Sequence, residues 1–175
     1  MSFYAQDEWQ IFNPLYLVLG VRYDDHSDFG SEFTPRASMI YSLFENLRLK
    51  ASYGTGFRAP SITELFLTEF RSQATVIYEP NPDLDPEESQ SYEIGIEGEY
   101  KNLSARITAF RNEFDDMIEP IYYKTVGQGK RKEFYYRMGN IAEAITQGVD
   151  LEARMDLPYG FWLNGNLAYL DLEVD

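Results

Sequence analysis

The chain contains no cysteine, a single histidine and no long apolar run. Without cysteine it has neither a disulfide framework nor a thiolate metal site. A transmembrane helix needs about 18 or more consecutive apolar residues, and this sequence has no such run. Apolar material is nevertheless abundant, since 44% of the 175 residues are hydrophobic and 16% are aromatic. This composition is far from that of a disordered chain, and one domain covering residues 1–175 is the default expectation.

Basic residues are also scarce relative to acidic ones. The formal net charge is −14, which argues against nucleic-acid binding because such binding needs a basic surface. The sequence has no Walker loop, dinucleotide fingerprint, nucleophile elbow or zinc motif. We therefore predict that the chain is not an enzyme and that it carries no cofactor.

What the sequence does contain is eight stretches in which apolar and polar residues alternate, as in β-strands. The clearest sets Leu47, Leu49, Ala51 and Tyr53 against Arg48, Lys50, Ser52 and Gly54. Each stretch lasts roughly nine to eleven residues, the length that a tilted strand needs to cross a bilayer, whereas ordinary strands have about five or six. Several apolar faces end in aromatic residues, as expected of the aromatic girdles of outer-membrane barrels.

The links between these stretches alternate between short and long. The short links are Asn13-Pro14, Glu45-Asn46, Lys101-Asn102 and residues 158–160, and the long ones are residues 24–32, 55–89 and 116–141. A transmembrane β-barrel places short turns on one side and long loops on the other. We predict an all-β fold, an antiparallel up-and-down meander of about eight long strands.

The polar faces of the strands also bear on the fold. A face that carries Glu93, Glu97 and Glu99 cannot form a dry core without a large desolvation cost, but it can line a wet lumen. Two alternatives stay open at this point. One is a complete eight-stranded outer-membrane barrel, and the other is a soluble β-rich ligand-binding protein that buries Leu47, Leu49 and their peers.

The long link after the fourth stretch has local signals of its own. Ser61 and Glu64 have the spacing of a capping box and follow Pro60, which predicts a short helix over residues 62–66. Three prolines between Glu79 and Glu87 argue against regular structure there.

Several segments resemble TonB-dependent outer-membrane receptors, and the resemblance covers most of the chain. The matching pieces are Tyr53-Gly54-Thr55-Gly56-Phe57-Arg58-Ala59-Pro60-Ser61, Glu64-Leu65-Phe66, Asn81-Pro82-Asp83-Leu84, Tyr92-Glu93-Ile94-Gly95 and Gly148-Val149-Asp150. The first and third include boxes that also occur in haem, cobalamin, siderophore and colicin receptors. Haem receptors are expected to place a histidine between these boxes, and the only histidine here is His26. The choice of ligand therefore stays open.

The resemblance implies a 22-stranded transmembrane β-barrel with a plugged lumen, of which this chain supplies only part. Residues 1–4 have no features of a signal peptide, and we expect the chain to be a piece of a longer protein. The implied function is energised uptake of a bulky nutrient such as an iron-siderophore, haem or cobalamin. The implied location is the outer membrane of a Gram-negative bacterium. The implied partners are the nutrient, membrane lipid and the TonB energy complex, the last through a part absent from this chain.

The resemblance also implies that outer loops capture the ligand. Candidate contacts on these loops are Arg58, Glu64, Phe66, Tyr78, Tyr122 and Tyr123. For Arg58 an ion pair with a loop acid is the structural alternative. Asp24, Asp25 and Asp28 are weak candidates for a calcium site through their carboxylate oxygens, and a solvated loop is the alternative for them.

Overall fold

The computed structural model describes residues 1–66, 70–72 and 75–174. The chain divides into two compact units. Unit 1 comprises residues 1–56, 89–113 and 145–174, and unit 2 comprises residues 57–88 and 114–144. Within the described residues, no helix is long and apolar enough to cross a membrane.

Unit 1 is an antiparallel sheet built from the long strands of the chain. These are β1 (Ser2–Phe12), β2 (Leu15–His26), β3 (Gly30–Phe44), β4 (Leu47–Arg58), β7 (Glu87–Tyr100), β8 (Leu103–Val126), β9 (Glu133–Asp156) and β10 (Trp162–Val174). In unit 1 each long strand pairs with the next long one along the chain, which confirms the predicted up-and-down meander. Among the described residues, β1 pairs only with β2 and β10 only with β9, so the sheet has no closing seam near Tyr4 and Leu167. This finding argues against a complete eight-stranded barrel.

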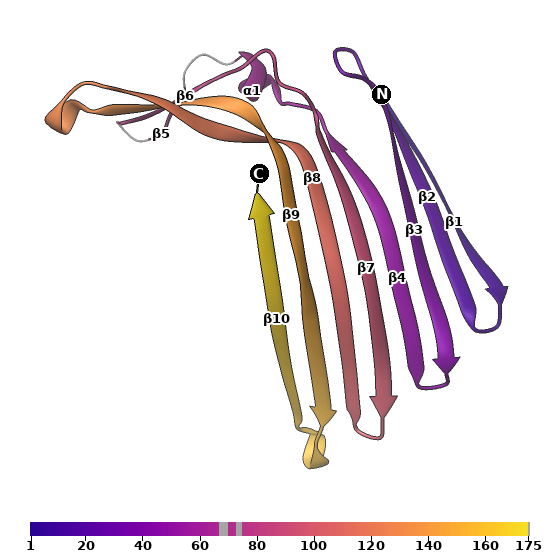
Figure 1. Cartoon of the computed structure of the whole chain (residues 1–175). Helices are drawn as coiled ribbons and strands as arrows, with labels where there is room; N and C mark the ends of the chain where they lie inside the picture. Colours follow the sequence, from indigo (N-terminus) through magenta and orange to yellow (C-terminus); the bar gives the residue numbers. More distant parts are fainter. Residues whose placement is uncertain (67–69, 73–74, 175) are drawn as a thin grey trace. The chain divides into compact units, whose positions relative to one another are not determined.

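The short turns of unit 1 lie at one end of its sheet (Figure 1). Residues 13–14, 45–46 and 101–102 form tight turns, and the 3-10 helix η2 (Pro158–Gly160) joins β9 to β10. These positions are the predicted ones. In η2, Tyr159 has a left-handed backbone with φ of 64°.

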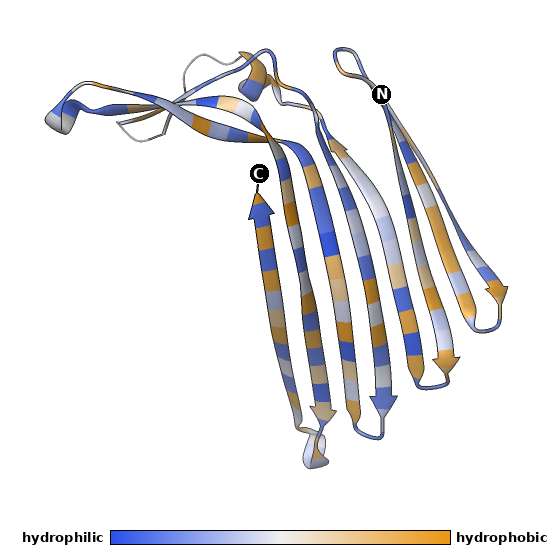
Figure 2. Ribbon diagram, viewed as in Figure 1, coloured by the Kyte–Doolittle hydropathy of each residue, from blue (hydrophilic) through white to orange (hydrophobic). Residues whose placement is uncertain are grey.

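The register of unit 1 places apolar residues beside apolar ones. Leu17 on β2 lies opposite Trp9 on β1 and Met39 on β3, and Met39 lies opposite Ala51 on β4. One position along, Val18, Ser38 and Ser52 form the matching row of the other face. Figure 2 shows the alternation of hydrophobic and hydrophilic residues along these strands. A shift of one residue would exchange the two faces, so this pattern fixes the register.

Two of the predicted long links are shorter than expected, and the prediction was wrong there. The strands β2 and β3 continue to His26 and from Gly30, so only three residues separate them. Likewise β8 and β9 run 24 residues each, to Val126 and from Glu133, where residues 116–141 were expected to be a loop. The 3-10 helix η1 (Gly129–Arg131) lies in the remaining link. Backbone pairing continues where the alternation of side chains stops, because pairing does not require one face to be apolar.

Unit 2 contains the elements of the link between β4 and β7, together with parts of β8 and β9. These elements are α1 (Ile62–Phe66), β5 (Phe70–Ser72) and β6 (Val76–Glu79). The helix has the predicted bounds and its capping box is formed. The backbone N–H of Ser61 donates to Glu64 Oε2 at 2.7 Å, and the N–H of Glu64 donates to Ser61 Oγ at 3.3 Å. Residues 80–86 have no regular structure, as the three prolines predicted.

The strand β6 departs from the antiparallel pattern, because it pairs with β9 in parallel. The ladder joins four residue pairs, from Val76–Phe134 to Glu79–Arg137. On its other side β6 pairs antiparallel with β5. The sequence analysis did not predict these two short strands.

Burial differs between the two units. The buried apolar side chains of the described residues all belong to unit 2, namely Leu65, Ile77, Leu84, Ile118 and Ala144. In unit 1 large apolar side chains remain exposed on every long strand, with Ile94 at 55% and Leu163 at 65%. A soluble domain of this size would bury such residues in a core. Unit 1 therefore presents an apolar face without a protein core behind it.

Candidate functional site: a wet strand face and an outer tyrosine surface

The polar face of unit 1 carries ion pairs between neighbouring strands. Lys50 Nζ on β4 lies 2.5 Å from Glu97 Oε2 on β7, and Arg48 Nη2 lies 3.0 Å from Glu97 Oε1. Arg106 Nη2 on β8 lies 2.7 Å from Glu152 Oε2 on β9. Exposed pairs of this kind contribute at most about 1 kcal/mol each. Their main consequence is chemical: this face bears charges of both signs and stays wet.

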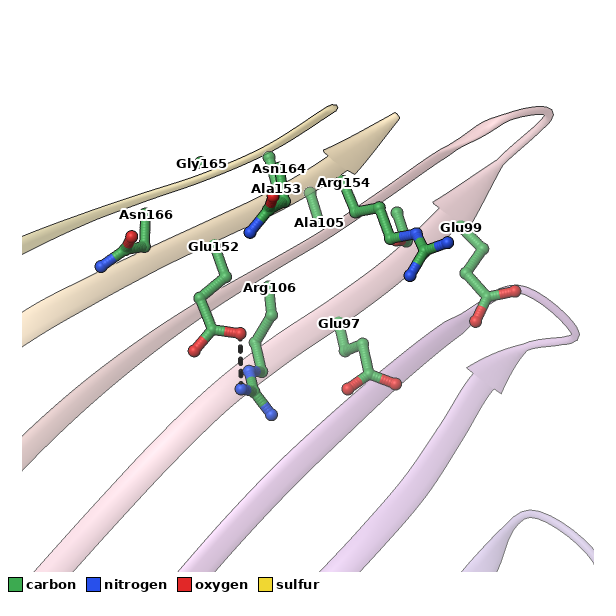
Figure 3. Close-up of a pocket in the computed structure, with 11 residues that line it drawn as sticks. Glu97, Glu99, Ala105, Arg106, Glu152, Ala153, Arg154, Asn164, Gly165 and Asn166 are labelled. Atoms are coloured by element: carbon green, nitrogen blue, oxygen red, sulfur yellow. Dashed lines mark hydrogen bonds and ion pairs between the residues drawn. The ribbon is translucent and has the colours of Figure 1, made fainter. Parts of the chain in front are cut away.

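Figure 3 shows a hollow on this polar face, with the Arg106–Glu152 ion pair in its wall. Its volume is about 520 Å³. Residues of β7, β8, β9 and β10 line it, namely Glu97, Glu99, Ser104, Ala105, Arg106, Glu152, Ala153, Arg154, Asn164, Gly165 and Asn166. Carboxylates, guanidinium groups and amides together favour water or a polar protein segment in this space.

In unit 2, Arg58 at the end of β4 binds two carboxylates. Its Nε and Nη2 donate to the two oxygens of Glu87 at the start of β7. Its Nη1 lies 3.2 Å from each oxygen of Glu64 in α1. Glu87 Oε1 also accepts the backbone N–H of Ile118 on β8 at 2.8 Å. We call Arg58, Glu64 and Glu87 the carboxylate clasp.

The clasp keeps its three groups charged. The hydrogen bonds from Arg58 hold the pKa of Glu87 below its ordinary value. For Glu64, burial raises the pKa, but the hydrogen bonds from Ser61 and Arg58 outweigh burial and lower it. The hydrogen bonds with Glu87 raise the pKa of Arg58. Arg58 and Glu64, both candidate ligand contacts, are therefore occupied with one another and with Glu87, a partner that the sequence analysis did not select.

Three tyrosines from three neighbouring strands form a row in unit 2. Tyr78 on β6 is the Cα partner of Tyr136 on β9, and their ring centroids lie 5.7 Å apart. The ring of Tyr122 on β8 lies 5.7 Å from that of Tyr136 on its other side. Tyr122 is 52% exposed, and its hydroxyl lies 2.7 Å from Thr125 Oγ1. We call Tyr78, Tyr136 and Tyr122 the tyrosine row.

Tyr123 belongs to a second group of side chains. Its ring centroid lies 6.5 Å from that of Tyr135, and its hydroxyl donates to Glu79 Oε2. Lys124 Nζ lies 4.8 Å from the Tyr123 ring centroid and 4.3 Å from that of Tyr135. The hydrogen bond with Tyr123 raises the pKa of Lys124. An open hollow of about 430 Å³ adjoins Tyr123 and is lined by Glu79, Asn81, Asp83, Ile121, Tyr123, Arg137, Met138 and Gly139.

The structure thus brings two of the three candidate tyrosines, Tyr78 and Tyr122, into one row. Phe66 ends α1 and is 65% exposed. The sequence analysis missed Tyr135 and Tyr136 as partners of this surface. A signal was present: the Tyr122-Tyr123 and Tyr135-Tyr136 doublets flank the same link, and a hairpin places such doublets opposite one another.

The acidic candidates for calcium lie at the β2–β3 turn. Asp24 Oδ2 lies 2.7 Å from Arg22 Nε, and the hydroxyl of Ser2 donates to the same carboxylate. Asp28 lies beside His26, with 3.9 Å between Asp28 Oδ2 and His26 Nδ1. Asp25 uses its backbone carbonyl to accept the amino group of Met1 at 2.5 Å. Across residues 1–66, 70–72 and 75–174, no group of three acidic, histidine or cysteine residues is placed to hold a metal ion. A calcium site here remains a prediction.

A meander of long strands with one wet, ion-paired face and one exposed apolar face is the wall of a transmembrane β-barrel. The family model described as "TonB dependent receptor-like, beta-barrel" matches residues 1–175. The chain belongs to this family, whose members lie in the outer membrane of Gram-negative bacteria. Membership decides against the soluble β-rich alternative.

Relatives with known names support the assignment. The chain is 28% identical to the ferric enterobactin receptor of Pseudomonas aeruginosa, over 97% of this chain and 24% of the relative. It is 32% identical to the iron-regulated outer membrane virulence protein of Vibrio cholerae, over 97% of this chain and 27% of the relative. The siderophore receptor PirA from Pseudomonas aeruginosa has a similar structure, with a TM-score of 0.86 and 25% identity over 99% of this chain and 34% of PirA. The chain spans about a quarter of the length of these curated relatives. Two of the relatives are named as a receptor and a transporter, namely the ferric enterobactin receptor and the vitamin B12 transporter BtuB of Photobacterium profundum, to which the chain is 30% identical over 87% of this chain and 22% of the relative.

Proposed function

We propose that this chain forms part of the barrel wall and of the outer ligand surface of a TonB-dependent nutrient receptor. The tyrosine row is the observation that carries the proposal. Two of its members, Tyr122 and Tyr136, lie on β8 and β9 in the halves of these strands that are remote in sequence from the short turns at residues 101–102 and 158–160. Short turns face the periplasm in outer-membrane barrels, so the opposite strand ends face outward. Flat aromatic faces with phenol hydroxyls suit the capture of a bulky ligand that carries rings.

The remaining parts of the chain have supporting roles in this proposal. The exposed apolar residues of unit 1 contact outer-membrane lipid, and the polar face with its ion pairs lines the lumen of a 22-stranded barrel. Residues 1–175 act as one part of that barrel domain. The TonB energy complex acts through another part of the receptor. The barrel supplies a wall and a capture surface and carries out no bond chemistry.

The ligand is a scarce, bulky nutrient, namely an iron-siderophore, haem or cobalamin. Relatives of this chain are named as a ferric enterobactin receptor and as a vitamin B12 transporter. An iron-siderophore fits the row best, because the only histidine of the chain is His26, and the tyrosine row offers rings and hydroxyls in place of an imidazole.

Ligand binding to the whole receptor that contains this chain tests the proposal. Ferric enterobactin, haem and vitamin B12 are each titrated into the purified receptor. The same titrations are made with the receptor variants Tyr78→Ala and Tyr122→Ala. Each variant should weaken binding of one probe by about five- to tenfold, because an aromatic contact is worth roughly 1 kcal/mol. Tyr159→Ala, a tyrosine that is 97% exposed at a short turn, is the matched control and should bind normally. Equal loss in all three variants, or no binding of any probe, contradicts the proposal.

A further inference from the structure

The side-chain amide of Asn140 on β9 makes three hydrogen bonds to the backbone of two distant segments. Its Nδ2 donates to the carbonyl of Asp85 at 2.9 Å and to the carbonyl of Asp116 on β8 at 2.6 Å. Its Oδ1 accepts the backbone N–H of Asp85 at 3.0 Å. One amide thus satisfies both backbone groups of Asp85, as a neighbouring strand would.

The segment that Asn140 binds cannot be held by strand pairing. Residues 80–86 include three prolines, which have no N–H to donate, and none of the seven residues lies in a strand. Asn81 Oδ1 accepts the N–H of Asp83 at 3.1 Å, which makes a local turn. Leu84 is only 3% exposed and anchors the segment. A side-chain amide from β9 takes the place of the missing ladder.

The backbone of β8 is unusual at Asp116, whose carbonyl accepts from Asn140. Asp116 has φ of 54°, in the left-handed region that aspartate tolerates better than most residues. Ile118, two residues on, is 6% exposed and donates its N–H to Glu87 of the carboxylate clasp. Asn140 therefore joins three segments of unit 2, namely β8, β9 and residues 80–86.

The segment held by Asn140 directly follows β6, which carries Tyr78. The β6–β9 ladder is parallel and has only four residue pairs, so it is weak by itself. Tyr136, the partner of Tyr78, precedes Asn140 on the same strand, β9. We propose that Asn140 is the positioning residue of the tyrosine row: by fixing Asp85 to β9 it holds the register of β6 and keeps the Tyr78 ring beside Tyr136. Only the consequence for ligand affinity rests on the proposed function.

Amide hydrogen exchange in the whole receptor, without ligand, tests the positioning role. Asn140→Ala should speed the exchange of β6 amides by about tenfold or more and leave β1–β4 unchanged, since three hydrogen bonds are lost. Asn140→Ser keeps a short hydroxyl that can replace one of the donations, and it should give an intermediate rate. Asn102→Ala is the matched control, because Asn102 Nδ2 donates to the carbonyl of Asp156 at 2.8 Å at the short turn between β7 and β8.

The outcomes are distinguishable. Faster exchange confined to β6 and residues 80–88 supports the positioning role, and an equal rise across all strands, or the same rise in Asn102→Ala, overturns it. If Asn140→Ala does not fold, Asn140→Ser decides by the same criterion.

A double-mutant cycle on ligand affinity separates positioning of the Tyr78 ring from a general loss of stability, because only positioning couples the effects of Asn140 and Tyr78 on affinity. The probes are ferric enterobactin, haem and vitamin B12. The losses from Asn140→Ala and Tyr78→Ala should not add, because the first displaces the Tyr78 ring and the second removes it. The losses from Asn140→Ala and Phe66→Ala should add. Simple additivity with Tyr78→Ala overturns the inference. If no probe binds the unchanged receptor, the proposed function is wrong and the exchange experiment alone decides on Asn140.

Discussion

Arg58 and Glu87 lie 29 positions apart in the sequence and form a two-pronged ion pair. Arg58 ends β4 and Glu87 begins β7, and these two strands are neighbours in the sheet. The chain between them leaves the β4–β7 strand pair, contributes β6 to a ladder with β9, and returns to β7. The ion pair therefore joins the end of β4 to the start of β7, and the helix and two short strands that lie between them in the sequence do not separate these two strands.

Replacing Arg58 should loosen this excursion. Arg58→Ala removes hydrogen bonds to both Glu87 and Glu64 and leaves two partly buried carboxylates with backbone N–H partners but without their cation. Because the side chain of Arg58 is 46% exposed, we expect a modest loss of roughly 1 kcal/mol, measured as faster hydrogen exchange of α1 amides. Arg154→Ala, which removes a more exposed pair with Asp156, should have no effect on α1. Unchanged α1 exchange in Arg58→Ala would show that the clasp contributes nothing.

The clasp should also make stability depend on pH. The pKa values of Glu87 and Glu64 are lowered below the ordinary 4.5 in the folded protein. Their stabilisation is therefore complete above about pH 4.5 and is lost as the pH falls through the lowered folded-state values. The thermal midpoint of the receptor should exceed that of Glu87→Gln at pH 7, and the difference should shrink as the pH falls from about 4.5. A constant difference down to pH 3 would contradict this account.

Gly148 on β9 should tolerate no side chain. A Cβ at this position would clash with the backbone oxygen of Tyr169 on β10 and would lie 2.9 Å from Cζ of Phe110 on β8. Since backbone cannot move away cheaply, Gly148→Ala should destabilise the barrel by about 1–3 kcal/mol, measured by urea unfolding in lipid. Gly165→Ala is the control, because a Cβ there meets open space. A neutral Gly148→Ala would mean that β9 and β10 are less closely packed than described.

Adjacent residues on β7 should respond in opposite ways to the same new charge. Ile94 is 55% exposed on the apolar face, whereas Glu93 on the polar face accepts a hydrogen bond from Ser52 Oγ at 3.2 Å. In a lipid-facing position Ile94→Arg should cost about 2–4 kcal/mol near the bilayer midplane, and Glu93→Arg should cost much less. Unfolding from lipid vesicles measures both. If water covered the apolar face, Ile94→Arg would be neutral, which would refute contact with lipid.

The strand pattern was readable from the sequence wherever one face must be apolar. Leu47, Leu49 and Ala51 alternate with polar residues, and the four short links were predicted where the structure has them, whereas the short β2–β3 turn was expected to be a long loop. The helix of residues 62–66 was also predicted, because a capping box is a local signal. The strands beyond Asp116 and before Ile141 were missed, because there both faces carry mixed residues and the alternation disappears.

The candidate site was predictable only in part. Tyr78 and Tyr122 were selected, and the structure places them in one row, but their central partner Tyr136 was missed. Glu87 and Asn140 were missed as binding partners for the same reason. Their partners lie 29 and 55 positions away, and no local pattern marks a pair at such a distance.

By itself, the sequence determined that the chain forms the wall of a transmembrane β-barrel. Successive side chains of a strand point to opposite faces, so a strand between water and hydrocarbon alternates with a period of two, and it ends in tight turns and aromatic residues. Within the link between β4 and β7, the sequence predicted α1 and the irregular residues 80–86, and tertiary structure alone decided the pairing of the other elements. It paired β6 with β9 in parallel, occupied Arg58 with two acids and aligned the three tyrosines. The physical reason is range. Local steric and hydrophobic preferences act within a few residues. The contacts of the carboxylate clasp and the tyrosine row join residues that become neighbours only after their strands have paired.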